Sequence, residues 1–185
     1  DGRRELPPQR PQHLLLRAAK RYRVFFWEEP IWHKPGEIAA AGAEGARLEV
    51  AEEAPSLWVV QPHLTEGLDP EAAQRKLLGE FVDRFSVANY VRWYYTPMAL
   101  GFSRQLEAAA TVYDCMDELS HFLNAPAQLR AREQELFCIA DVVFTGGVSL
   151  YEAKREQHPN VHAFPSSIDV PHFAAAAIFR EGLIL

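Results

Sequence analysis

The chain has 185 residues, of which 48% are hydrophobic and 24% charged, a balance that is typical of one soluble globular domain and does not suggest disorder. Its 19 basic and 25 acidic side chains give a formal net charge of −6, which excludes a general attraction for nucleic acid or anionic lipid. No apolar run approaches the roughly 20 residues of a membrane span, and no signal peptide is visible. The two cysteines, Cys115 and Cys138, fit reduced, packed thiols and favour a cytoplasmic protein.

Short β-favouring runs alternate with amphipathic helical segments along the whole chain. The expected elements, in chain order, are a helix over 11–22, a strand over 23–27, a long loop over 28–47, strands over 48–51 and 56–60, a helix over 69–85, a strand over 90–95, a helix over 96–106, a strand over 111–113, a helix over 119–140, a strand over 141–145, a helix over 149–158 and a strand over 161–164. Strands separated by helices of this length predict right-handed crossovers. We therefore expect an α/β fold, a Rossmann-like parallel sheet with helices on both faces.

Ligands of such a sheet bind beyond the carboxyl ends of its strands. The polar residues at these positions are Glu28, Glu29, Gln61, His63, Thr96, Asp114, Asp117, Glu118, Thr145, Gly146, Ser166, Ser167 and Asp169. This edge is acidic and rich in hydrogen-bonding groups. It suits a hydroxyl-bearing ligand better than a phosphate-rich one.

The acidic turn over 114–118 is the most informative of these segments. Asp114, Asp117 and Glu118 repel one another, so at least one should have a raised pKa unless a cation lies nearby. One of these carboxylates could orient an acceptor hydroxyl or act as a base. In the alternative interpretation, Asp117 caps the following helix and Glu118 is solvated, and both interpretations stay open.

Two other segments carry weaker indications. Arg10 and His13 lie at a helix start, where free backbone N–H groups favour an anion, although this segment taken alone favours a merely exposed helix start over an anion site. The pair Gly146-Gly147 lacks the spacing of a phosphate-binding loop and predicts a tight turn. The seven histidines show no metal-ligand spacing, so no metal site is expected.

Five motifs occur in an order that resembles the N-terminal domain of bacterial GT-B glycosyltransferases of the retaining, family-four type. They are QRPQHLL over 9–15, WYYTPM over 93–98, VYDCMDELS over 112–120, DVVFTGG over 141–147 and FPSSID over 164–169. The resemblance covers about residues 9–173. It implies an N-terminal Rossmann-like domain over 9–173, with a polar extension over 1–8 and a tail over 174–185 at the crossing into a second domain.

The resemblance also implies a function and a set of site residues. Such enzymes transfer a hexosyl group from a nucleotide sugar to a glycan or lipid-linked acceptor in cell-envelope or exopolysaccharide synthesis, without a bound metal or cofactor. The acceptor lies on this domain and the donor on a C-terminal domain, in a longer chain or a separate subunit, so this chain alone is expected to be inactive. The expected catalytic residues are Asp114, Asp117 and Glu118, in a turn where relatives commonly carry histidine. The expected substrate-binding residues are Arg10, His13, Glu28, His63, Thr96, Ser166, Ser167 and Asp169.

Relatives carry a further strand before the first motif, at the centre of the sheet. Residues 1–8 are too polar and proline-rich to form it, so either another segment fills that position or the domain has limited stability. A non-catalytic Rossmann-like binding module is the alternative function, and it predicts an exposed apolar face. A nucleotide-sugar epimerase or dehydrogenase ranks last, because no glycine-rich phosphate turn is visible.

Overall fold

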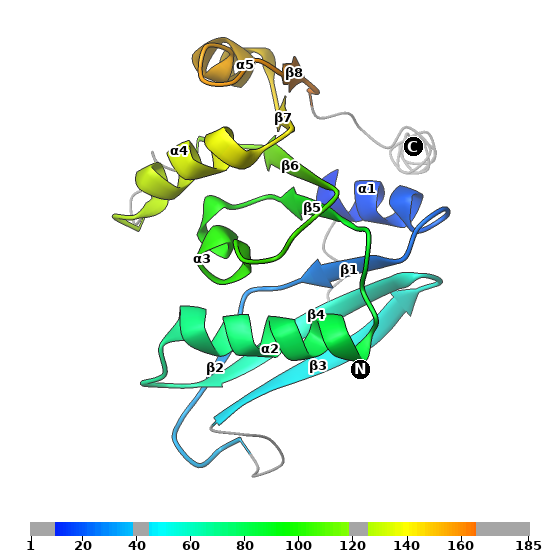
Figure 1. Ribbon diagram of the computed structural model, residues 1–185, viewed down its shortest axis with the longest axis vertical. Helices are drawn as coiled ribbons and strands as arrows, with labels where there is room; N and C mark the ends of the chain where they lie inside the picture. Colours follow the sequence, from blue (N-terminus) through cyan, green and yellow to red (C-terminus); the bar gives the residue numbers. More distant parts are fainter. Residues whose placement is uncertain (1–9, 39–44, 119–125, 166–185) are drawn as a thin grey trace, which may run out of the picture.

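The computed structural model describes residues 10–38, 45–118 and 126–165, and it has a mixed α/β architecture with parallel strands flanked by helices (Figure 1). The strands are β1 (Val24–Trp27), β2 (Ile31–His33), β3 (Ala46–Ala54), β4 (Leu57–Thr65), β5 (Val91–Tyr94), β6 (Ala110–Cys115), β7 (Val142–Thr145) and β8 (Val161–Ala163). The helices are α1 (Arg10–Ala18), α2 (Pro70–Arg84), the 3₁₀ helix η2 (Pro97–Ala99), α3 (Leu100–Ser103), α4 (Leu129–Ile139) and α5 (Val148–Lys154). The predicted α/β, Rossmann-like fold is confirmed, but its strands form two sheets instead of one.

Sheet A, formed by β1 to β4, is organised around β4. β1 pairs in parallel with the first part of β4 and β2 pairs in parallel with its last part, while β3 pairs with it antiparallel over nearly its full length. β1 and β2 therefore follow each other along one edge of β4, and β3 occupies the other. Glu28–Pro30 connect the two short strands, and the proline has no N–H to donate to a ladder.

Sheet B, formed by β5 to β8, is parallel throughout and its spatial order is its chain order (Figure 1). Each strand is joined to the next by a segment that contains helix, as a parallel connection requires. The carboxyl ends of all four strands consequently lie at one edge of the sheet.

Aromatic side chains fasten α2 to sheet A. The Phe25 ring packs edge-on against Phe81 with centroids 5.1 Å apart, and the Trp27 indole N–H donates to Gln74 at 3.1 Å. Such edge-to-face pairs are worth about 0.5–1.5 kcal/mol beyond the area that they bury. The helix begins where the sequence predicts, because the Asp69 side chain accepts from the N–H groups of Glu71 and Ala72.

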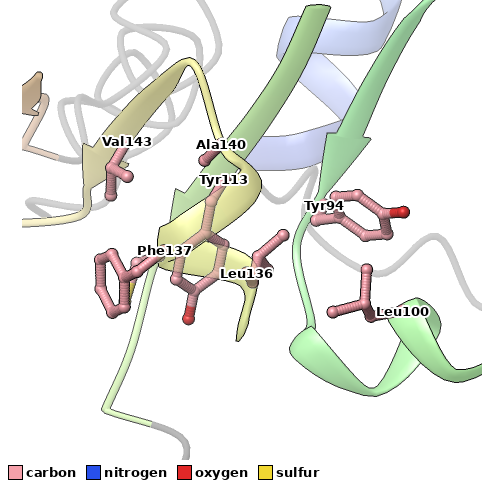
Figure 2. Packing of buried hydrophobic residues seen from close by; sticks show 8 residues of the cluster. Tyr94, Leu100, Tyr113, Leu136, Phe137, Ala140 and Val143 are labelled. Carbon is pink, nitrogen blue, oxygen red and sulfur yellow. The ribbon is translucent and has the colours of Figure 1, made fainter. Parts of the chain in front are cut away.

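The core of sheet B lies between its strands and α4 (Figure 2). Tyr113 is completely buried, and its ring packs edge-on against Phe137 at 5.5 Å between centroids. Leu136 from α4 and Val143 from β7 are also fully buried. Cys115 is buried at the end of β6, whereas Cys138 is exposed on α4, so the expectation that both thiols are packed is wrong for Cys138.

Several predicted boundaries differ from the structure. The expected loop over 28–47 contains β2, and the expected helix over 96–106 is η2 followed by α3. The expected helix over 149–158 is α5, which begins at Val148 after the N-cap Gly147 and ends at Lys154. Within the described ranges, no helix has both the length and the apolar character needed to cross a bilayer.

Candidate functional site

The polar edge predicted for the parallel sheet exists at the carboxyl ends of β5, β6 and β7. Thr96 follows β5, and its hydroxyl caps η2 by accepting from the Met98 N–H at 3.3 Å. Cys115 at the end of β6 is in register with Thr145 at the end of β7. The Gly146 N–H donates to the Cys115 carbonyl at 2.9 Å, which holds the two strand ends together.

Gly146 approaches the acidic turn so closely that no side chain fits between them. A Cβ atom placed on this residue would lie 2.5 Å from the Met116 carbonyl oxygen and 3.1 Å from its Cα. The Gly146-Gly147 turn that the sequence predicts is therefore also a packing contact. It supports the backbone that leads to Asp117 and Glu118.

A buried lysine organises the charges of this edge. Lys154 at the end of α5 is only 4% exposed, and its Nζ lies 2.9 Å from the carboxylates of both Glu118 and Glu133. The Tyr113 hydroxyl donates to the second oxygen of Glu133 at 2.8 Å. One cation thus holds a carboxylate from the acidic turn and another from α4.

The ionisation of this cluster follows from its burial and its partners. Burial alone would lower the pKa of Lys154, but hydrogen bonds to Glu133 and Glu118 outweigh it and raise that pKa. Burial raises the pKa of the Tyr113 hydroxyl and raises the pKa of the Cys115 thiol to about 11. At neutral pH the cluster therefore holds a charged amine, a neutral phenol and a protonated thiol, so Cys115 is not poised as a nucleophile.

The three predicted catalytic carboxylates lie in different surroundings. Asp114 is completely buried in β6, Asp117 is exposed, and Glu118 is paired with Lys154. Lys154 is a cation close to this turn, and Glu118 is the one of the three carboxylates for which an ion pair with it is seen. Of the three, Asp117 has the most exposed side chain, and it is not one of the carboxylates that Lys154 holds.

His63 does not follow a strand as predicted, because β4 continues to Thr65. Instead it lies inside sheet A, 6% exposed, with its Nδ1 2.8 Å from the Nε2 of His33 and 3.4 Å from the guanidinium of Arg47. Its Nε2 lies 3.3 Å from the Glu49 carboxylate. Burial, reinforced by Arg47 and partly opposed by Glu49, lowers the pKa of His63.

This lowered pKa predicts a loss of stability in acid. Below the ordinary value of 6.5 the unfolded chain binds a proton that His63 in the folded protein resists, so stability falls as pH drops through 6.5 towards the folded pKa. We expect urea titrations to show that the free energy of unfolding changes less between pH 7.5 and pH 5.5 in His63→Gln than in the parent. His162→Gln changes an exposed histidine and is the control. It should show the same change in the free energy of unfolding between the two pH values as the parent. If the two variants show the same change as each other, His63 is not the source of the pH dependence.

Of the remaining predicted site residues, those that the structure describes do not follow a strand of sheet B. Glu28 is half-buried beside β1 in sheet A, and its N–H donates to the Val60 carbonyl at 3.0 Å. His13 is half-buried in α1, and Arg10 begins that helix, with its side chain outside what the structure describes. Ser166, Ser167 and Asp169 lie outside the described residues, as do the 1–8 extension and the 174–185 tail.

Sequence reasoning missed the two residues that organise the site, Lys154 and Glu133. The pattern of α5 contains a usable indication, because Lys154 is four residues after Leu150 and three after Tyr151, and both are partly buried. A charged residue on the inner face of a short helix requires a buried partner. Glu133 carries a comparable indication, since Leu129 lies four residues before it on α4, Leu136 and Phe137 lie three and four residues after it, and all three are buried.

No model of a known protein family and no curated protein matches this sequence. Among the residues that the structure describes, no group of three His, Cys, Asp or Glu side chains is placed to hold a metal ion. Function must therefore be argued from the site itself.

Proposed function

We propose that this chain is the acceptor-side domain of a nucleotide-sugar-dependent glycosyltransferase that transfers a hexosyl group to a glycan or lipid-linked acceptor. In this proposal Asp117 orients the acceptor hydroxyl or accepts its proton. Thr96 and the backbone around Gly146 flank the acceptor, and the nucleotide sugar binds to a second domain. The site of action is the cytoplasm, peripheral to the inner membrane.

The observation that carries the proposal is the exposed Asp117, which lies beside the ion pair of Glu118 and Lys154 at the carboxyl ends of parallel strands. An accessible carboxylate next to hydrogen-bonding backbone suits a neutral hydroxyl ligand, and it disfavours a diphosphate through charge repulsion. Because Lys154 is committed to two carboxylates, the cluster offers little positive charge to a phosphate. The geometry therefore supports an acceptor site better than a donor site.

Ligand titrations followed by amide NMR test this assignment. We expect neutral hexoses and N-acetylhexosamine to shift the amide signals of Thr96, Met116 and Gly146, and UDP to leave them unchanged. Asp117→Asn should weaken the sugar response, whereas Glu80→Gln, on the exposed side of α2, should not. A stronger response to UDP at these amides, or sugar transfer by this chain alone, would overturn the proposal.

A second candidate, a non-catalytic interaction module, is favoured by one specific observation. Trp93, Phe144 and Phe164 form a row on sheet B, with ring centroids 5.6 and 5.0 Å apart, and Trp93 and Phe164 are 44% and 55% exposed. Exposed aromatic surface of this kind marks interaction sites. Light scattering distinguishes the candidates: an interaction module is expected to self-associate with rising concentration, and Trp93→Gln should reduce that association. A strictly monomeric protein would count against it.

A further inference from the structure

Few contacts hold β2 to its sheet. Its three residues pair with the last part of β4, and within the described ranges no other strand pairs with them. The side chains of Ile31 and Trp32 are both 44% exposed, so neither contributes much buried area. His33 is the least exposed of the three, and its contact with His63 is therefore the main side-chain anchor of β2.

The contact between the two histidines needs a lone pair on one of the facing nitrogens. Nε2 of His33 lies 2.8 Å from Nδ1 of His63, and the two rings stack with their centroids 5.0 Å apart. A hydrogen bond between them has one N–H and one unprotonated nitrogen, so the facing nitrogens cannot both carry a proton. The contact is consequently lost when both rings are charged.

Two neighbours on β3 fix which nitrogen of His63 is protonated. The Arg47 guanidinium lies 3.4 Å from Nδ1 and can only donate, whereas the Glu49 carboxylate lies 3.3 Å from Nε2 and, when ionised, can only accept. The proton of neutral His63 is therefore on Nε2, and Nδ1 accepts from both Arg47 and His33. A second proton, added to Nδ1, would make both of these contacts repulsive.

The surrounding charges decide how far the pair resists acid. Within the described residues, the charged or titratable groups that face His63 are Arg47 and Glu49 from β3 and His33 from β2. The charged residues that follow the two strands are Lys34, Glu37 and Glu66. Burial and Arg47 lower the pKa of His63 and Glu49 partly opposes them, so His63 stays neutral to a pH below the ordinary value of 6.5.

We infer that His33 and His63 form an acid-sensitive latch, which holds β2 on the end of β4 at neutral pH and releases it when both rings carry a charge. Release leaves β1 and β3 on β4, because neither of them pairs with β2. The edge of β4 over residues 63–65 then has N–H and C=O groups that another strand can use. This inference does not depend on the proposed function.

Amide hydrogen exchange of the full chain at pH 7.5 and pH 5.0 tests the latch, because one amide reports on β2. The Glu66 N–H donates to the His33 carbonyl at 2.8 Å, whereas the Val24 N–H donates to the Ser56 carbonyl at the opposite end of β4, where β1 begins. Protection factors correct for the effect of pH on intrinsic exchange. In acid, we expect the protection factor of Glu66 to fall at least tenfold more than that of Val24.

His33→Gln removes one charge and keeps the latch closed, since the glutamine amide can either donate to Nδ1 of His63 or accept from it. In this variant Glu66 should lose no more protection in acid than Val24. His162→Gln is the matched control, because it changes an exposed histidine of sheet B, and it should behave like the parent.

Two variants on β3 should shift the pH of release in opposite directions. Arg47→Gln removes a charge that disfavours protonation of His63, so release should move to higher pH, and Glu49→Gln removes a charge that favours it, so release should move to lower pH. Equal losses of protection at Glu66 and Val24 in the parent, an unchanged acid response in His33→Gln, or shifts in the same direction for the two β3 variants would each overturn the latch.

Discussion

Replacing Lys154 with methionine is expected to lower the free energy of unfolding by about 3–5 kcal/mol at pH 7, because it leaves two carboxylates in a largely buried cluster without their cation. Methionine retains most of the side-chain volume, so lost packing contributes little. Urea denaturation followed by fluorescence of the tryptophans measures the change. The turn that carries Asp117 should also lose order, seen as faster amide exchange at Met116.

The pH dependence of this variant checks the mechanism. In the parent, the raised pKa of Lys154 means that its stabilising contribution is complete below the ordinary lysine value and is lost only as pH rises through the folded value. In Lys154→Met, acid protonates Glu118 and Glu133 and relieves their repulsion. The stability difference from the parent should therefore shrink between pH 7 and pH 4.

A charge-free triple variant is the matched control. Lys154→Met combined with Glu118→Gln and Glu133→Gln removes the cation and both carboxylates, and we expect it to recover much of the lost stability. If Lys154→Met alone is as stable as the parent at pH 7, the cluster does not hold the fold together in the way described.

Substituting Gly146 with alanine is expected to cost about 1–3 kcal/mol, because its Cβ would lie 2.5 Å from the Met116 carbonyl oxygen and backbone must move to relieve the contact. The displaced segment is the start of the acidic turn. Gly146→Ala should therefore also weaken the sugar response at Met116, beyond its effect on stability. Chemical denaturation and the NMR titration measure the two effects separately.

Gly147 provides a control one residue away. It has an extended backbone, with φ of −170°, and a Cβ added to it would meet nothing within 4 Å. Gly147→Ala should lower the free energy of unfolding by no more than about 1 kcal/mol, which is the loss expected when alanine replaces glycine as an N-cap without any new steric contact. Equal losses for both variants would mean that flexibility of the Gly-Gly pair, and not the contact with Met116, is what matters.

The elements that sequence predicts well are those whose information is local. Asp69 followed by proline specifies the start of α2, and Thr96 before Pro97 specifies the start of η2, because each side chain caps a helix within three residues. The apolar runs of β1 and β7 identify strands for the same reason. The carboxyl edge of sheet B then follows from the topology of any parallel sheet.

The features that sequence missed depend on contacts between distant segments. Ile31–His33 form a strand because they pair with β4, although the segment has the sequence character of a loop. No local feature of these three residues predicts that pairing. Glu133 meets Lys154 only because α4 and α5 pack beside the same strand ends. The sequence predicts that the strand before His63 ends at residue 60, whereas pairing with β3 and β2 extends β4 to Thr65.

The central position of β4 in sheet A has a consequence for how the chain folds. None of β1, β2 and β3 pairs with another of these three, and each pairs with β4, the last of the four to be synthesised. Among the described residues, the strands that precede β4 therefore have no ladder to form until β4 has been synthesised, and then all three ladders become available. Sheet B differs, since β6, β7 and β8 each pair with the strand that precedes them in the chain, so each can add to an edge that already exists during translation.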